Sequence, residues 1–228
     1  MATKKKSKTK KATKAKKPTK AKKPAKRAAP KMKLAAAPAA AVPVRGQFVW
    51  YELMTTDTAA AKRFYTQVAG WGTTAYQHDP SYTMWTNKGA PLGGLMALPE
   101  DARRMGVPPN WTAYVTTPDV DAAARQAVAL GGKVLKAPTD LPGTGRFAIV
   151  QDPQGAAIAV YKSTQASPAP TGHPKNGEFS WHELATTDHG AALRFYSALL
   201  GWVKTDAMDM GPGGLYQMFG TEKKRSLG

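Results

Sequence analysis

GQFVWYELMTTDTAAAKRFYTQVAGWGTT, residues 46–74, is the stretch that decides the fold, because it occurs twice. Residues 177–205, which begin 131 positions later, read GEFSWHELATTDHGAALRFYSALLGWVKT. The two copies share aromatic, acidic and threonine residues at matching positions: Phe48/Phe179, Trp50/Trp181, Glu52/Glu183, Thr56/Thr187, Asp57/Asp188, Phe64/Phe195, Tyr65/Tyr196 and Trp71/Trp202. A match of this length indicates a duplicated structural unit and not merely similar composition.

Each copy is expected to open with a strand followed by a helix. Residues 48–54 are aromatic and apolar β-formers, which is typical of a strand with both faces at least partly covered. Thr56 or Asp57 can cap the following helix, and apolar residues then recur at helical spacing until Gly70 closes it. The aromatic residues at helical spacing are expected in the core; they are Phe64, Tyr65, Phe195 and Tyr196.

The rest of the 131-residue period predicts two modules of the type βαβββ. Short strands are expected near residues 72–76, 82–86 and 92–98, which completes the first module. The pattern then recurs more weakly, with a strand at 111–116, a helix at 120–130 capped near Asp119, and strands at 133–136, 147–151 and 156–161. Asp152-Pro153-Gln154-Gly155 forms the last hairpin turn. The modules therefore cover roughly residues 46–99 and 110–162.

These residues resemble the vicinal oxygen chelate superfamily, which includes glyoxalase I, bleomycin-resistance proteins and extradiol dioxygenases. The resemblance rests on the strand before Thr-Thr-Asp, on the helix ending in Gly-Trp, and on the late Asp-Pro-Gln-Gly turn. It implies an α+β fold in which paired βαβββ modules form a curved mixed sheet around a cavity, with a divalent metal held by side chains from both modules.

The predicted domain organisation has four parts. Residues 1–45 are a basic tail and a Pro/Ala linker, residues 46–162 a complete glyoxalase-like domain, residues 163–176 a second linker, and residues 177–228 a partial second domain of one module. We expect that this lone module either belongs to a shortened member of a four-module family or pairs with a second chain as a homodimer, because the inner face of its sheet has no partner module.

The metal-ligand positions are where the sequence departs from the family. The resemblance places ligands at Trp50, Thr112 and Ala159, and Trp181 occupies the corresponding position in the second copy. Indole and methyl groups do not coordinate, and a lone hydroxyl is a poor ligand for Zn, Ni, Mn or Fe. We therefore expect no metal or other cofactor, with a divalent metal as the alternative.

Glu52 is the candidate around which a binding site is expected. Alternation along the strand places Phe48, Trp50, Glu52 and Met54 on one face. The predicted ligand-binding residues are Trp50, Glu52, Met54, Thr112 and Tyr114, with Trp181 and Glu183 as counterparts in the second copy. A carboxylate among aromatic rings is desolvated, which suits proton abstraction or pairing with a cationic ligand. The alternative is that Glu52 only fixes the packing through Tyr or Trp donors.

Positive charge is concentrated in the tail. The chain has 33 Lys and Arg against 15 Asp and Glu, giving a net charge of +18, and 16 of the basic residues lie in residues 1–33, where there is no acid. Subtracting +16 from +18 leaves about +2 for the remainder. The tail is predicted to be disordered and resembles the Lys/Ala/Pro tails of linker histones and histone-like bacterial proteins.

Such a tail favours binding to the phosphates of DNA or another polyanion, without sequence preference. The predicted nucleic-acid-binding residues are Lys4, Lys5, Lys6, Lys10, Lys11, Lys16, Lys17, Lys22, Lys23, Lys26 and Arg27. A merely solubilising tail is the alternative. The chain has no cysteine and no run of apolar residues long enough to span a membrane, so we expect a cytoplasmic protein, associated with the nucleoid if the tail binds DNA.

Two functions of different class follow from the sequence. The first is a metal-free module that binds a small planar or cationic compound, as the resistance branch of the family does by sequestration. The second is a metal-dependent lyase, isomerase or dioxygenase of the same superfamily. Whether the protein is an enzyme is left open by the sequence.

Overall fold

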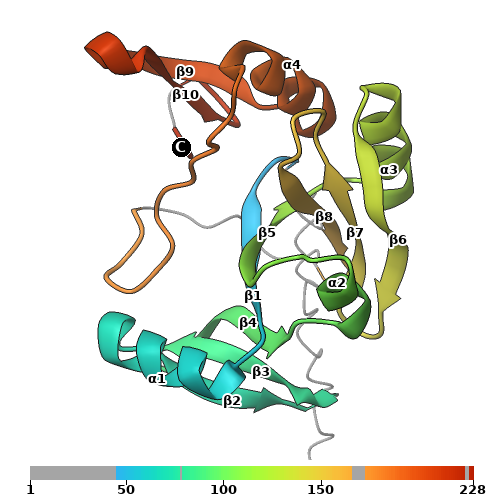
Figure 1. Ribbon diagram of the computed structural model, residues 1–228, viewed down its shortest axis with the longest axis vertical. Helices are drawn as coiled ribbons and strands as arrows, with labels where there is room; N and C mark the ends of the chain where they lie inside the picture. Colours follow the sequence, from blue (N-terminus) through green and yellow to red (C-terminus); the bar gives the residue numbers. More distant parts are fainter. Residues whose placement is uncertain (1–44, 78, 166–172, 224–225) are drawn as a thin grey trace, which may run out of the picture. The chain divides into compact units, whose positions relative to one another are not determined.

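The computed structural model describes residues 45–77, 79–165, 173–223 and 226–228. The basic residues predicted to bind nucleic acid, together with His78, lie outside these ranges. The described part contains an eight-stranded mixed sheet with the strand order β2-β3-β4-β1-β5-β8-β7-β6 and a separate two-stranded sheet (Figure 1). No helix in these ranges is long and apolar enough to cross a membrane.

The first two modules form as predicted. The first contains β1 (Phe48–Thr55), α1 (Thr58–Ala69), β2 (Gly72–Tyr76), β3 (Asp79–Asn87) and β4 (Ala90–Ala97). The second contains β5 (Asn110–Thr116), α3 (Val120–Ala129), β6 (Lys133–Leu141), β7 (Gly145–Gln151) and β8 (Ala157–Ser163). The short helix α2 (Glu100–Arg104), which connects the modules, was not predicted.

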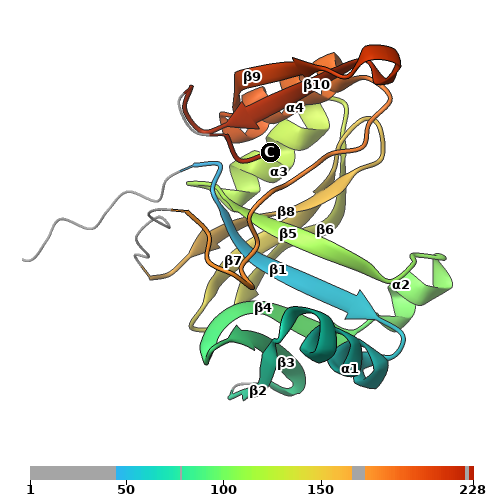
Figure 2. The ribbon, with the colours of Figure 1, turned by 90° about the vertical axis from the view of Figure 1, so that its left-hand side faces the viewer.

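The modules join through their first strands. β1 pairs in parallel with β4 of its own module and antiparallel with β5 of the next, while β5 pairs in parallel with β8. Figure 2 shows β1 and β5 side by side in the middle of the sheet. This arrangement confirms the α+β architecture of paired βαβββ modules that the resemblance implied.

The helix boundaries follow from local chemistry. The side chain of Asp57 accepts a hydrogen bond from the Ala60 amide at 2.8 Å, and Asp119 caps α3 in the same way through Ala122 at 2.9 Å. Gly70 ends α1 at φ 70°, a left-handed conformation that favours glycine. Both predicted caps and the predicted stop are confirmed.

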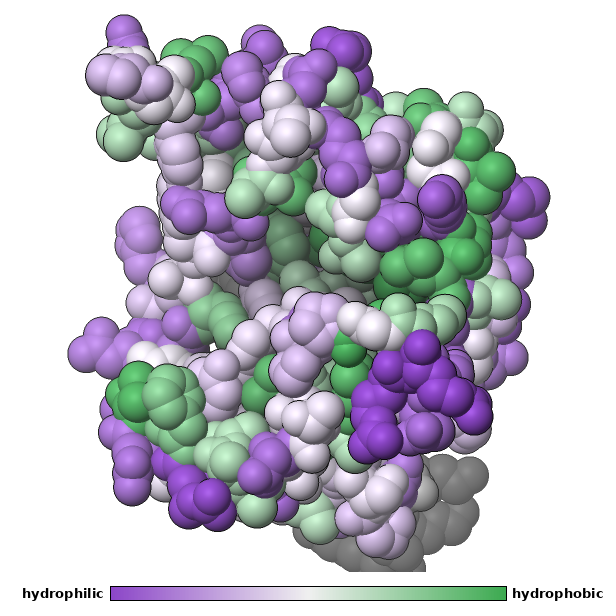
Figure 3. Space-filling model, viewed as in Figure 1, coloured by the Kyte–Doolittle hydropathy of each residue, from purple (hydrophilic) through white to green (hydrophobic). Residues whose placement is uncertain are grey.

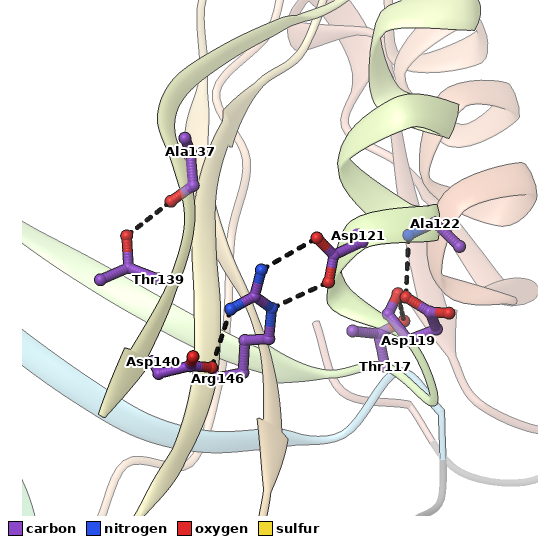
Figure 4. A network of polar contacts seen from close by, with 8 residues as sticks. All are labelled: Thr117, Asp119, Asp121, Ala122, Ala137, Thr139, Asp140 and Arg146. Carbon is purple, nitrogen blue, oxygen red and sulfur yellow. Dashed lines mark hydrogen bonds and ion pairs between the residues drawn. The ribbon is translucent and has the colours of Figure 1, made fainter. Parts of the chain in front are cut away.

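Arg146 on β7 ties the second module together. Its guanidinium donates to both carboxylate oxygens of Asp121 on α3, at 2.8 and 2.9 Å, and to Asp140 on β6 at 2.7 Å (Figure 4). These contacts raise the pKa of Arg146 and lower that of Asp121 through hydrogen bonding. The group is partly exposed and fixes the start of α3 against the sheet.

The second copy of the repeat forms only in part. It contains α4 (His189–Leu200), β9 (Val203–Asp209), the 3₁₀ turn η1 (Gly211–Gly213) and β10 (Leu215–Gly220). The prediction of a strand at its start is wrong, because residues 179–186 form no strand. β1 forms backbone hydrogen bonds with a strand on each side. Among the described residues, the segment 179–186 is instead joined to another segment by one backbone hydrogen bond, from the His182 amide to the Leu227 carbonyl at 3.2 Å.

Aromatic side chains hold this segment against β1 instead. The Phe179 ring stacks on Tyr51 with centroids 3.7 Å apart, and the His182 ring stacks on Phe48 at 3.6 Å. The Tyr51 hydroxyl and the His182 Nε2 atom are 2.5 Å apart. The segment therefore contributes to the core while lacking sheet geometry.

The two repeated helices differ in what they bury. Phe195 on α4 is 4% exposed, because α4 packs in a common core with α3. The prediction that Phe64 is a core residue is wrong, since this side chain is 56% exposed. Figure 3 shows apolar residues gathered at the surface over α1. Tyr65, by contrast, packs against Trp71 and Trp85.

Candidate functional site

The inner face of the large sheet is the face opposite to α1 and α3. Residues paired across neighbouring strands point to the same side. The pairs Glu52/Thr112, Trp50/Tyr114 and Tyr114/Ala159 therefore share one face, while Leu53, Val115 and Val150 belong to the cores under the helices. The structure thus places all five predicted residues of this domain on the inner face: Trp50, Glu52, Met54, Thr112 and Tyr114.

Phe48 does not lie on this face, so the prediction that it shares a face with Trp50 is wrong. The register between β1 and β5 shifts between Phe48 and Trp50, which marks a β-bulge. A bulge inserts one residue and reverses the alternation of side chains beyond it. Phe48 consequently points outward, where it packs against Trp202.

Glu52 lies at the centre of the inner face and is 8% exposed. The Tyr82 hydroxyl donates to its Oε2 atom at 2.9 Å, and the Tyr114 hydroxyl donates to Oε1 at 3.1 Å. The indole Nε1 of Trp50 donates in turn to the Tyr82 hydroxyl oxygen at 3.0 Å. We call these four residues the Glu52 network; since Tyr114 comes from β5, the network joins both modules.

Burial sets the protonation of this network. Desolvation raises the pKa of Glu52, and the hydrogen bonds from Tyr82 and Tyr114 and the charge of Lys136 oppose that rise. The pKa values of Tyr82 and Tyr114 are raised, first by burial and then by the neighbouring Glu52 charge. Both phenols therefore remain hydrogen-bond donors to Glu52.

Gly94 makes room for this arrangement. It pairs with Glu52 on β1 and with Met84 on β3, so its missing side chain would point into the inner face. A Cβ atom at this position would overlap the Tyr82 hydroxyl. The Tyr82 ring can cross β4 to reach Glu52 only because the residue beneath it is glycine.

Aromatic and aliphatic side chains surround the network. Tyr114 and Phe147 are buried, and partly buried groups pack against them: Val49, Trp50, Leu141, Ile149 and Tyr161. Lys136 places its Nζ atom 5.8 Å from the centroid of the Phe147 ring. The inner face therefore offers ring surfaces, the buried acid Glu52 and the exposed cation Lys136.

The two ends of the sheet are linked across this face. Tyr76 at the end of β2 makes a 2.9 Å hydrogen bond to the Thr144 hydroxyl, and Tyr161 donates to the Thr144 carbonyl at 2.9 Å. β2 and β6 are the edge strands of the sheet, and Thr144 lies in the turn between β6 and β7. The sheet is therefore curved enough for the edge strand β2 to contact the turn between β6 and β7.

The donor atoms at this site do not fit a divalent metal. The described residues contain no group of three or more His, Cys, Asp or Glu side chains that could share an ion. Trp50 donates its only polar hydrogen to Tyr82, Thr112 donates to Asn110 at 3.1 Å, and Ala159 has no donor atom. Glu52 alone could coordinate, and both of its oxygens already accept phenolic hydrogen bonds.

Trp181 and Glu183, the predicted counterparts in the second copy, are joined through Tyr216 and do not belong to the network around Glu52. Trp181 Nε1 donates to the Tyr216 hydroxyl at 2.8 Å, and that hydroxyl donates to Glu183 Oε1 at 2.6 Å. The bridging tyrosines were not among the predicted site residues. The similarity between YTMW (residues 82–85) and YQMF (residues 216–219) is the sequence signal that indicates Tyr82 and Tyr216 as equivalent residues of the two copies.

Two cavities of the described residues lie away from the Glu52 network. One of about 530 Å³ separates the β7–β8 turn from residues 185–187, and one of about 400 Å³ lies between α1, β1 and the start of β5. The first is bridged by Gln154, whose side-chain oxygen accepts from Thr186, from Thr187 and from the Asp188 amide. These bonds anchor the start of α4.

The sequence and the fold agree with a known family. A model of the Glyoxalase/Bleomycin resistance protein/Dioxygenase superfamily matches residues 47–160, and the chain belongs to this superfamily. The match covers the two complete modules that carry the Glu52 network.

Two curated relatives are similar over 175 residues. CFP32 of Mycobacterium tuberculosis, whose name assigns it provisionally to the glyoxylases, is 34% identical over 74% of this chain and 65% of its own length. The anthracycline biosynthesis protein DnrV of Streptomyces peucetius is 35% identical over 71% of this chain and 62% of its own. The chain thus spans less than two thirds of the length of these relatives.

Solved structures show the same fold at low identity. Homoprotocatechuate 2,3-dioxygenase from Brevibacterium fuscum is 18% identical, with a TM-score of 0.54 over 81% of this chain and 59% of the enzyme. The Mn(II)-bound glyoxalase from Novosphingobium aromaticivorans is 19% identical, with a TM-score of 0.50 over 74% of this chain and 56% of that one.

Proposed function

We propose that the inner face binds a planar aromatic compound that carries a positive charge, without a metal ion, and that the protein acts by sequestering this compound. The observation that carries the proposal is the Glu52 network. It presents a buried carboxylate, oriented by a tyrosine from each module, beneath a surface of aromatic rings. Such a group favours a cation or a strong hydrogen-bond donor that replaces the water it has lost.

The ring surfaces set the shape of the ligand. Trp50, Phe147 and Tyr161 offer flat apolar contacts around Glu52, and aromatic pairs add stabilisation beyond the area that they bury. The name of DnrV refers to anthracyclines, which are planar polycyclic compounds. This name supports an aromatic ligand for the present chain and does not identify it.

An enzyme that uses Glu52 as a base is the second candidate. Burial raises the pKa of this carboxyl group, which is the direction that makes a carboxylate a better proton acceptor near neutral pH. A metal-dependent lyase, isomerase or dioxygenase is disfavoured by the donor atoms at Trp50, Thr112 and Ala159.

Thermal unfolding of the full chain tests the choice between these functions. A ligand that binds only the folded state stabilises it by about 2.7 kcal/mol at a hundredfold excess over its Kd. We expect phenyltrimethylammonium to raise the melting temperature and its neutral isostere tert-butylbenzene to have a smaller effect. Zn, Ni, Mn and Fe(II) should leave it unchanged; a large rise with one metal would instead favour the metal-dependent enzyme.

Two variants locate the effect. Glu52→Gln should reduce the stabilisation by the cation, whereas Glu222→Gln, which changes an exposed carboxylate of the second copy, should leave its size unchanged. Stabilisation as large in Glu52→Gln as in the unchanged protein would show that the cation does not bind at Glu52.

We also propose that the N-terminal tail binds DNA or another polyanion. The support is compositional, because residues 1–33 hold 16 of the 33 basic residues and no acid. Binding through phosphates weakens steeply as salt rises. The full chain should therefore bind duplex DNA with a steep salt dependence, and a variant lacking residues 1–45 should not; equal binding by both would defeat the proposal.

A further inference from the structure

The network of Trp181, Tyr216 and Glu183 repeats the two hydrogen bonds that run from Trp50 through Tyr82 to Glu52. In each case an indole N–H donates to a tyrosine hydroxyl, which donates to a glutamate oxygen, with lengths of 3.0 and 2.9 Å in the first copy and 2.8 and 2.6 Å in the second. We call the second set the Glu183 network. It forms although the strand carrying Trp50 and Glu52 has no equivalent strand in the second copy.

The two networks differ in exposure. Glu52 is 8% exposed and receives a second hydrogen bond from Tyr114, which belongs to the facing module. Trp181 is 46% exposed and Glu183 is also exposed. Within the described residues, Tyr216 is the only hydrogen-bond donor to Glu183. The second carboxylate therefore keeps accepting capacity toward solvent.

The Glu183 network nevertheless has a fixed geometry. The hydrogen bond to Glu183 is the main cause that raises the pKa of Tyr216, so the phenol remains a donor that holds the carboxylate beside the Trp181 indole. Met208 pairs with Tyr216 across β9 and β10 and is 49% exposed, so it borders the same side of this small sheet. An oriented carboxylate, an indole and a thioether thus face solvent together.

We infer that the Glu183 network is a second binding site for aromatic organic cations, separate from the site at Glu52. A carboxylate next to an exposed indole attracts a cation through charge and through the ring face, and the indole is the strongest of the aromatic side chains in this respect. The inference rests on the ligand chemistry proposed for the Glu52 network, whose indole, bridging tyrosine and glutamate recur in the Glu183 network.

Exposure predicts how the two sites differ. Cation–ring attraction is weaker at exposed positions than at desolvated ones, and salt screens exposed charges more than buried charges. We expect the Glu183 site to bind the same cation roughly tenfold more weakly than the Glu52 site and to lose affinity faster as salt rises.

Indole N–H signals of the isotope-labelled full chain can follow both sites in one titration. The chain has six tryptophans, and the variants Trp50→Phe and Trp181→Phe assign the two signals that matter. The probe is phenyltrimethylammonium, with tert-butylbenzene as the neutral control. We expect the Trp181 signal to shift to saturation with the cation and to shift little with the neutral compound.

Carboxylate variants connect the shift to the proposed site. Glu183→Gln should abolish the Trp181 response and leave the Trp50 response, whereas Glu52→Gln should do the reverse. Glu222→Gln removes another exposed carboxylate of the same copy and should leave both responses in place. A far-ultraviolet dichroism spectrum like that of the unchanged protein checks that each variant is folded.

The outcomes separate the two proposals. A Trp181 signal that does not move while the Trp50 signal does would overturn the second site and leave the proposed function standing. A Trp50 signal that does not move while the Trp181 signal does would overturn the proposed binding at Glu52 and leave the second site standing. A Trp181 shift that persists in Glu183→Gln would show contact with the ring only and would overturn the second site.

Discussion

The charge state of Glu52 should affect the free energy of unfolding of the protein and make it depend on pH. Its folded-state pKa is raised by burial, so the folded protein binds more protons than the unfolded chain just above the ordinary pKa of glutamate. The stability associated with Glu52 is therefore complete below that ordinary value and is lost as pH rises through the raised folded value.

Glu52→Gln should remove this pH dependence. We expect the unfolding free energy of the unchanged protein to fall relative to that of the variant as pH rises above the ordinary pKa of glutamate and through the raised folded pKa. At the acidic end the two proteins should differ least, because an amide resembles the protonated carboxyl group in shape and in charge. Urea unfolding at several pH values measures the difference, and a constant difference across the range would refute the raised pKa.

Gly94→Ala should disturb the same network without changing a polar group. The added methyl group would meet the Tyr82 hydroxyl and force the ring away from Glu52, at a cost of about 1–3 kcal/mol. In a Tyr82→Phe background the hydroxyl is absent, and the same substitution should cost less. Equal costs in both backgrounds, measured by urea unfolding, would mean that Tyr82 does not depend on Gly94.

Single residues differed in how far the sequence could place them. Trp50 and Glu52 were predicted because the repeat and the alternation of a strand identify them directly. Tyr82 was not, because it reaches Glu52 across β4, and in the sequence only the short similarity between YTMW (residues 82–85) and YQMF (residues 216–219) marks its position. Phe48 was placed on the wrong face, because one inserted residue reverses the alternation and leaves no clear compositional sign.

At the level of elements, helix caps and turns could be predicted from the sequence. Whether a repeated segment forms the same secondary structure in both copies could not. Asp57, Asp119 and Gly70 act locally, so the sequence identifies them without knowledge of the fold. The segment at residues 179–186 repeats the sequence of β1 but forms no strand, because a strand requires neighbours to complete its hydrogen bonds. Sequence similarity therefore fixed the helix of the second copy and not its first strand.

The helices α1 and α4 provide a matched pair for testing this dependence on surroundings. Phe64 and Phe195 occupy the same position of the repeat, yet the first is 56% exposed and the second 4%. Phe195→Ala should cost about 3–5 kcal/mol through the cavity it leaves, whereas Phe64→Ala should change stability by about 0.5 kcal/mol or less. Urea unfolding of both variants measures this contrast, and similar costs would show that α4 is not packed on α3 as described.

Across the molecule, the second copy combines a well-packed helix with weakly supported strands. α4 shares a core with α3 and the second half of the sheet, and Gln126 donates to the Ala198 carbonyl at 3.0 Å. β9 and β10 form a sheet of their own with two strands. An isolated two-stranded sheet is marginal in water, whereas strands inside a larger sheet have partners on both sides.

Hydrogen exchange should therefore divide residues 177–228 into two parts. Amides of α4 should be protected nearly as well as those of α3, because opening α4 exposes their common core. Amides of β9, β10 and residues 179–186 should exchange faster than those of β1, β5 and β8. Equal protection throughout residues 46–163 and 177–228 would contradict this, and it would mean that the second copy unfolds only together with the large sheet.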